Sequence, residues 1–169
     1  HMIKIPELAS GNSNGRHLVF VGGAPRSGTT LVQRILNAHP QIYGGTEFGT
    51  NMIAELRNRF MTLVKRDKIT EIADEETLND GFRALILTIF NRKLVQTEKE
   101  YFTEKTPANV LEFETLMTLF PEAKFVLVLR DPRAVAASMK KGLADRKKNN
   151  RTYPSGFRDA ASRAEMINH

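Results

Sequence analysis

The sequence VGGAPRSGTTL, at residues 21–31, decides the fold of this chain. A short apolar run, Leu18 to Val21, leads into it, and apolar residues at helical spacing follow it, so the stretch joins a strand to a helix. Its glycines allow backbone N–H groups to approach an anion closely, and the start of the helix adds unpaired N–H groups and the positive end of a dipole. We interpret it as a phosphate-binding loop; the alternative is a turn whose glycines only permit close packing.

The spacing of this loop is that of a Walker A loop with one substitution. Four residues separate Gly23 from Gly28, and a hydroxyl stands at the final position, Thr30. Thr29, however, occupies the place of the lysine that reaches the β and γ phosphates in P-loop NTPases, and Arg26 lies inside the loop instead. Phosphate binding through the backbone survives this change, whereas the usual ATPase or kinase arrangement does not.

Apolar runs elsewhere in the chain predict further strands. Strands are expected at residues 18–21, 101–105 and 124–130, with a short extended piece and a loop at residues 41–49. The run at 124–130 is apolar throughout its middle, which is typical of a central parallel strand. Because helical patterns separate these strands, the sequence predicts an α/β fold of three layers, a parallel sheet with helices on both faces.

Helices are predicted from the spacing of apolar residues and from capping residues. One begins near Asn51, another follows Asp74 as its N-cap, and Thr106 is expected to cap a helix that starts at Pro107. The helix from Asn51 is expected to place Arg57 outside its buried face. The apolar residues that predict this face repeat at intervals of three and four: Met52, Ile53, Leu56, Phe60, Leu63 and Val64.

The length of 169 residues suits a single domain. Residues 1–16 are expected to form a flexible lead-in that includes a tag residue, and residues 17–169 to form the domain, with helical composition at residues 157–169. The hydrophobic share of 41% and charged share of 26% are those of an ordinary soluble protein, and no run reaches the ~20 apolar residues of a membrane span. Cysteine is absent, which excludes disulfides, and a cytoplasmic location is expected.

The positive charge of the chain is concentrated in one segment. Residues 139–151 hold six Lys and Arg residues and Asp145, a net +5 of the total of +6. This distribution argues against a general nucleic-acid-binding protein, which would be basic over a wider surface. The segment is interpreted either as a solvated face or as a contact for an acidic acceptor.

The loop at residues 25–31 resembles the 5′-phosphosulfate loop of sulfotransferases that use 3′-phosphoadenosine 5′-phosphosulfate. Its arginine form is similar to that of the tyrosylprotein sulfotransferases. The resemblance covers roughly residues 18–139 and continues through several further motifs: Ala38-His39-Pro40, Gly45-Thr46-Glu47, Glu104-Lys105-Thr106-Pro107, Phe120 to Phe125, Leu129 to Ala134, and Ser138-Met139. It implies the P-loop nucleotide-binding fold of that family.

The resemblance also implies which residues bind the nucleotide donor. Arg130 and Ser138 would hold its 3′-phosphate, for which a planar, bidentate arginine is well suited. The alternatives are a surface ion pair for Arg130 and a neutral helix residue for Ser138. The 5′-phosphosulfate would bind to the loop itself: Arg26, Ser27, Gly28, Thr29 and Thr30.

Three residues are the expected catalytic groups. Arg26 and Lys105 would neutralise charge on the leaving phosphate, so no metal is expected. Glu47 would be the base that accepts the proton of the acceptor, because it matches the second acid in the tyrosylprotein-like branch, and Pro107 stands where cytosolic members place a histidine. The alternatives are a solvated lysine at a strand end for Lys105 and a surface loop residue for Glu47.

By this resemblance the function is sulfuryl transfer from 3′-phosphoadenosine 5′-phosphosulfate to a hydroxyl or amine acceptor, leaving adenosine 3′,5′-bisphosphate. The alternatives are an atypical P-loop kinase or NTPase and a non-catalytic nucleotide-binding fragment. Members of the family are longer than this chain, so we expect it to hold only the N-terminal and central part of the domain. An incomplete domain would expose an apolar sheet edge or helix face and favour self-association.

Overall fold

The computed structural model describes residues 14–45, 47–67 and 74–148. The described residues form a parallel sheet in the order β2-β3-β1-β4. Its strands are β1 (Leu18–Gly23), β2 (Ile42–Gly44), β3 (Tyr101–Lys105) and β4 (Lys124–Val128). The α/β prediction is therefore confirmed. Most of the predicted lead-in, Thr46 and the predicted helix at residues 157–169 lie outside the described residues.

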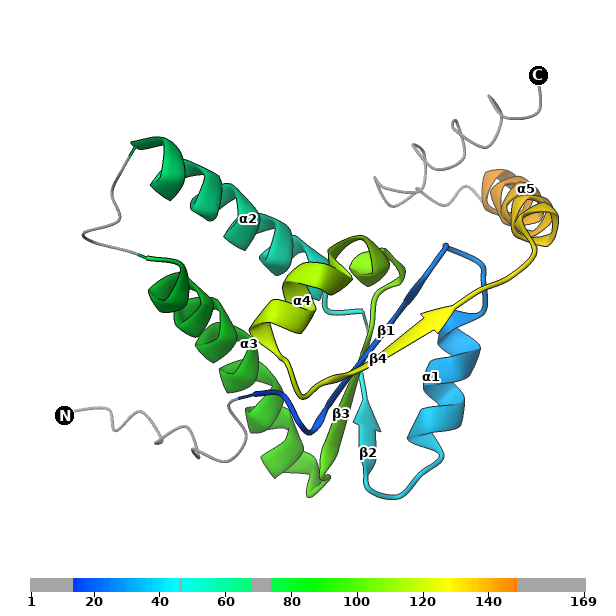
Figure 1. Ribbon diagram of the computed structural model, residues 1–169. Coiled ribbons are helices and arrows are strands. Elements are labelled where there is room, and N and C mark those ends of the chain that lie inside the picture. Colours follow the sequence, from blue (N-terminus) through cyan, green and yellow to red (C-terminus); the bar gives the residue numbers. More distant parts are fainter. Residues whose placement is uncertain (1–13, 46, 68–73, 149–169) are drawn as a thin grey trace.

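Helices cover both faces of the sheet (Figure 1). Helix α1 lies on one face, and α2, α3 and α4 lie on the other, while α5 stands beyond the end of β4. The bounds of the helices are α1 (Thr29–Asn37), α2 (Thr50–Asp67), α3 (Glu75–Thr97), the short 3₁₀ helix η1 (Pro107–Glu112), α4 (Phe113–Leu119) and α5 (Pro132–Lys148). The three-layer architecture predicted from the alternating pattern is confirmed, and Asp74 caps α3 by accepting a hydrogen bond from the Thr77 N–H at 2.8 Å.

Aromatic rings join the sheet to the helices of one face. The rings of Phe90 in α3 and Phe102 in β3 stack with centroids 4.1 Å apart. Phe20 in β1 contacts Phe120 after α4 at 5.7 Å and Phe125 in β4 at 5.5 Å. Such rings bury large areas and hold neighbouring elements in fixed positions. The parallel pairing of β1 with β3 places their carboxyl ends side by side.

The strand predicted at residues 124–130 forms over residues 124–128, but its predicted central position in the sheet is wrong for the part of the chain that the structure describes. Among the described residues β4 pairs only with β1, at the edge of the sheet, and its last partners are Gly23 and Val128. The ladder ends there because β1 turns away into the phosphate-binding loop, so Leu129, 82% exposed, and Arg130 lie beyond the strand. An apolar run shows that a strand can be buried, but not how many neighbours it has.

The predicted buried face of α2 is wrong in part, although Val64 is buried and Ile53 packs against the core as predicted. Met52, Leu56 and Phe60 are exposed, whereas Arg57 is buried and forms an ion pair with Glu75 at 2.5 Å. The Arg57 guanidinium also donates to Asn79 at 2.9 Å, so its burial leaves few donors without partners. Helix α3 already covers this face of the sheet, so α2 packs on α3, η1 and α4. The side of α2 that faces these helices differs in part from the predicted side.

The stability of this fold should fall as the pH drops below about 6.5, the ordinary pKa of histidine. His17 is buried and bonded to Asn91 at 2.8 Å, and burial lowers its pKa. The unfolded chain therefore binds this proton before the folded chain does, and stability is lost as the pH falls through the folded pKa. Thermal unfolding of the wild type and of His17→Gln across this range tests the effect.

The glutamine variant keeps an amide that can donate to Asn91 but does not titrate, so its melting temperature should change less over this interval. The carboxyls with lowered pKa values, Asp67, Asp74 and Asp131, titrate below 3.8 and do not interfere. An equal pH dependence in both proteins would show that His17 does not cause it.

Candidate functional site

The loop between β1 and α1 has the backbone of an anion-binding turn. Gly28, at the start of α1, has φ 109°, and Arg26 has φ 69°, a left-handed conformation that costs a non-glycine residue about 1 kcal/mol. Gly23 is required for a different reason, since a Cβ there would lie 2.5 Å from the Val128 carbonyl oxygen. Left-handed residues in such turns allow successive N–H groups to face one anion. The strained Arg26 therefore points to a functional loop.

Ser27 supplies an observation that fits a phosphate ligand. Its hydroxyl is buried and has no hydrogen-bond partner among the described residues. A buried hydroxyl without a partner is costly and calls for an explanation such as a bound group. Next to it, Thr29 is buried at the first position of α1, and Thr30 is exposed. The loop residues predicted to hold a phosphosulfate thus fit a phosphate group.

Arg130 and Ser138, which the resemblance assigns to the 3′-phosphate, lie beside this loop. The Arg26 Nε donates to the Ser138 hydroxyl at 3.2 Å, and the Arg130 Nη1 donates to the Arg26 carbonyl oxygen at 2.9 Å. This happens because β4 pairs with β1, so residues that follow β4 return to the loop that follows β1. The structure therefore brings residues more than a hundred positions apart into one cationic cluster.

Lys105 and Glu47 form a second part of the site. Lys105 ends β3, in register with Val21 of β1, and its ammonium lies 2.5 Å from the Glu47 carboxylate. The lysine side chain is only 7% exposed, whereas that of Glu47 is 54% exposed. The interpretation of Lys105 as a solvated lysine is therefore wrong. Both parts of the site lie at the carboxyl ends of adjacent parallel strands, where ligands bind in open α/β sheets.

The sequence analysis missed a buried polar network behind Glu47. Glu104 is 1% exposed and accepts hydrogen bonds from the Phe48 N–H at 3.1 Å, the Thr106 hydroxyl at 2.6 Å and the Asn109 amide. Thr106 stands at the N-cap position of η1, which begins at Pro107 as predicted, but its hydroxyl makes no cap bond and accepts from the Gly49 N–H instead. The signal for this network was Glu104 itself, two residues after Phe102 and therefore on the same buried face of β3.

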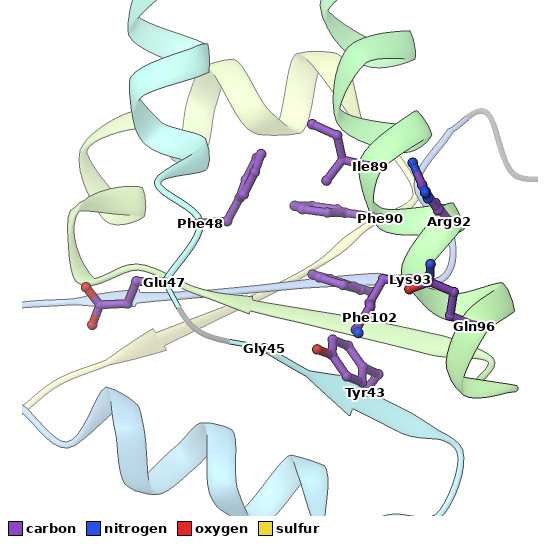
Figure 2. A pocket seen from close by; sticks show the side chains of 10 residues that line it. All are labelled: Tyr43, Gly45, Glu47, Phe48, Ile89, Phe90, Arg92, Lys93, Gln96 and Phe102. Carbon is purple, nitrogen blue, oxygen red and sulfur yellow. The ribbon is translucent and has the colours of Figure 1, made fainter.

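A cavity of about 300 Å³ adjoins Glu47 between the β2 edge and α3 (Figure 2). Figure 2 shows the Glu47 side chain extending away from the aromatic rings that line the cavity. Lys93 places its ammonium 5.3 Å from the centre of the Tyr43 ring. Aromatic and basic side chains make up most of the lining: Tyr43, Phe48, Phe90, Phe102, Arg92 and Lys93. No pattern in the sequence predicted this cavity.

The described residues contain neither a membrane-spanning helix nor a cluster of metal-binding side chains. None of their helices is long and apolar enough to cross a membrane. Nowhere in the described ranges do three or more His, Asp or Glu side chains come together as a candidate metal site.

The fold and the loop together define a P-loop-like nucleotide-binding protein of the α/β class. Residues 19–166 match the model of the sulfotransferase family, so the chain belongs to that family. The matched residues include the phosphate-binding loop, Lys105 and Arg130. It favours the sulfotransferase interpretation over an atypical kinase or NTPase.

Several animal proteins are similar to this chain over most of its length. Human protein-tyrosine sulfotransferase 1 is 34% identical over 125 residues, which cover 72% of this chain and 33% of the human protein. Protein-tyrosine sulfotransferase A of Caenorhabditis elegans is 30% identical over 148 residues, covering 82% and 37% of the two chains. The Drosophila melanogaster protein-tyrosine sulfotransferase is 31% identical over 125 residues, which cover 72% of this chain and 25% of the fly protein. The matched segment thus spans about a third of these relatives.

Proposed function

We propose that this chain carries the donor site of a sulfotransferase that moves a sulfuryl group from 3′-phosphoadenosine 5′-phosphosulfate to an acceptor hydroxyl or amine. The observation that carries the proposal is the cluster of Arg26, Ser138 and Arg130 at the phosphate-binding loop. The cluster places basic and hydroxyl groups beside an anion-binding turn. A nucleotide that carries phosphates at two positions requires two such neighbouring binding sites. Family membership supports the same conclusion.

The loop, Arg130 after β4 and Ser138 of α5 would divide the binding between them. Backbone N–H groups of the loop and the hydroxyls of Ser27 and Thr30 would hold the 5′-phosphosulfate. Arg130 uses one guanidinium nitrogen for the Arg26 carbonyl and retains others for the 3′-phosphate, which Ser138 also contacts. When bound, the donor supplies a sulfuryl group attached to a phosphate leaving group.

Arg26, Lys105 and Glu47 would perform the transfer. Arg26 and Lys105 offer positive charge where the leaving phosphate gains negative charge, the role that cations play in phosphoryl transfer. Glu47 would accept the proton of the acceptor hydroxyl, and its half-exposed carboxylate leaves room for an acceptor on the solvent side. Lys105 orients the Glu47 carboxylate from the buried side at 2.5 Å.

The acceptor to test first is a tyrosine in a peptide. The relatives are named protein-tyrosine sulfotransferases. The basic segment that begins in α5 supports an acidic peptide over a neutral one. A cytoplasmic location and self-association stay predictions.

Replacing Arg130 with alanine should weaken binding of adenosine 3′,5′-bisphosphate about 10- to 100-fold, the usual effect of losing a hydrogen bond to a charged group. Binding of adenosine 5′-monophosphate, which lacks the 3′-phosphate, should change little. Isothermal titration calorimetry of both nucleotides with the wild type and the variant measures the difference.

Arg133→Ala is the matched control for this experiment. Arg133 is exposed, lies three residues further on and pairs with Asp131 at 2.9 Å. It removes the same charge from the same region and should leave both affinities unchanged. Equal affinity of the wild type for the two nucleotides would contradict the assignment of the 3′-phosphate site. Binding of the bisphosphate without any sulfuryl transfer would favour the non-catalytic interpretation.

A further inference from the structure

Resting on the proposed function, we infer that Glu104, with Thr106 and Asn109, is a positioning residue that sets the place of the base Glu47. Glu47 lies on the chain segment between β2 and α2, which has no strand partner of its own among the described residues. A general base must lie within hydrogen-bond reach of the proton that it accepts. Something in the fold has to hold this segment against the end of β3.

The buried network holds the segment by accepting hydrogen bonds from three backbone N–H groups. The Phe48 N–H donates to the Glu104 carboxylate at 3.1 Å, and the Gly49 N–H donates to the Thr106 hydroxyl at 3.1 Å. The Asn51 N–H donates to the Asn109 side-chain oxygen at 3.1 Å. Phe48 and Gly49 directly follow Glu47, and Asn51 lies in the first turn of α2, so these bonds hold the backbone that leads away from the base.

The three acceptors behave as one unit because Glu104 binds the other two. The Thr106 hydroxyl donates to the carboxylate at 2.6 Å, and the Asn109 amide donates to its other oxygen. Glu104 and Asn109 are 1% and 0% exposed, so water does not replace these bonds easily. The orientation of each side chain is fixed, with Thr106 and Asn109 accepting from the loop and donating to Glu104.

The carboxylate is needed because only an acceptor with no hydrogen of its own satisfies all three donors. In Glu104→Gln, an amide NH₂ faces either the Asn109 NH₂ or the Phe48 N–H. Turning the Asn109 amide over relieves the first clash but then points its NH₂ at the Asn51 N–H. Each arrangement leaves one donor facing another, and the loop must shift.

Lys105 couples this network to the reacting groups. It follows Glu104 in β3, and its ammonium binds Glu47 while the preceding carboxylate binds the amide of Phe48. One strand therefore fixes both the side chain of the base and the backbone that follows it. A shift of the loop would move Glu47 away from Lys105 and from the acceptor together.

Amide hydrogen exchange measured by NMR tests the anchoring without using activity. Thr106→Val keeps the shape of the side chain and should speed exchange of the Gly49 amide roughly tenfold, the effect of about one hydrogen bond. Glu104→Gln should speed exchange at Phe48 or Asn51. Thr106→Ser keeps the hydroxyl and should restore protection. Unchanged exchange at these amides in both variants would overturn the inference.

Sulfuryl transfer from 3′-phosphoadenosine 5′-phosphosulfate to a synthetic acidic tyrosine peptide tests the positioning. Glu104→Gln and Thr106→Val should lower kcat about 10- to 100-fold, the effect expected of a misplaced catalytic group. Bisphosphate affinity and the KM for the donor should stay constant, because none of the hydrogen bonds described for the network reaches the loop between β1 and α1. Thr106→Ser should recover most of the rate.

Asn58→Ala is the matched control, because Asn58 donates to Glu112 at 3.1 Å and to Thr115 at 2.8 Å, away from the Glu47 segment. It should lower stability without lowering kcat. If it lowers kcat as much as Thr106→Val does, the effect is one of general stability, and the positioning role is wrong. If the wild type binds bisphosphate but transfers nothing, the proposed function fails and the positioning role with it, while exchange still reports the anchoring.

Discussion

Lys105→Met is expected to lower sulfuryl transfer about 100- to 1000-fold, the usual effect of removing one electrostatic contact to the transition state. Lys105 ends β3 beside β1, its ammonium is buried, and no other cation of the described chain holds Glu47. Methionine fills the same space without charge, so no cavity forms. The released Glu47 carboxylate is half exposed and regains water, so the fold should lose little stability. Rates under saturating donor and melting temperatures measure both quantities.

Lys124→Met is the matched control, with the same change of charge on the same sheet. Lys124 begins β4, at the opposite end of the strands from the site, and its ammonium lies 5.6 Å from the centre of the Tyr101 ring. Its loss should leave transfer unchanged. If Lys105→Met instead weakens bisphosphate binding by the same factor as it lowers the rate, Lys105 binds the nucleotide in the ground state and does not act on the transition state.

The sequence predicted the parts of the fold that depend on local pattern. The strand at residues 101–105 has the predicted bounds, and α1 ends at Asn37, shortly before His39-Pro40. Pro40 restrains the residue before it and cannot continue a helix, and glycines mark the turn after β1. Such signals need no knowledge of the neighbours in space.

The errors concern neighbours in space. Arg57 is buried because Glu75 and Asn79 of α3 satisfy its guanidinium, and no periodicity in α2 contains that information. The edge position of β4 follows from strand order, which an apolar run does not encode. For these features tertiary packing overrides the local pattern.

The candidate site follows the same division. The glycine-rich loop was visible in the sequence because its chemistry needs glycines at fixed spacing. The proximity of Arg130 and Ser138 to Arg26 followed from the resemblance, and the structure confirms that they are neighbours. The network around Glu104 was missed because its role depends on the burial of its side chains and on their position facing the Glu47 segment. The spacing of residues in the sequence does not show either property.

Glu47→Gln is expected to lower transfer about 100- to 10,000-fold, the range over which a general base contributes. The glutamine oxygen can still accept from Lys105, so the loop keeps its place, but the amide takes no proton from the acceptor. Bisphosphate affinity should stay close to that of the wild type. Among the described residues, Glu47 forms its side-chain hydrogen bond with Lys105 and none with the loop between β1 and α1. Stopped-time transfer assays and calorimetry on the same preparation separate the two effects.

Glu55→Gln is the matched control for this change. Glu55 is similarly exposed, at 51%, and pairs with Arg59 at 2.6 Å on α2, so the variant makes the same chemical change at a surface ion pair. Such pairs contribute little to stability, and transfer should be unaffected. A base acts only on the acceptor, so its loss lowers kcat while the nucleotide still binds. Loss of bisphosphate affinity in Glu47→Gln would instead show that the Glu47–Lys105 pair shapes the donor site, and would make Glu47 a structural residue.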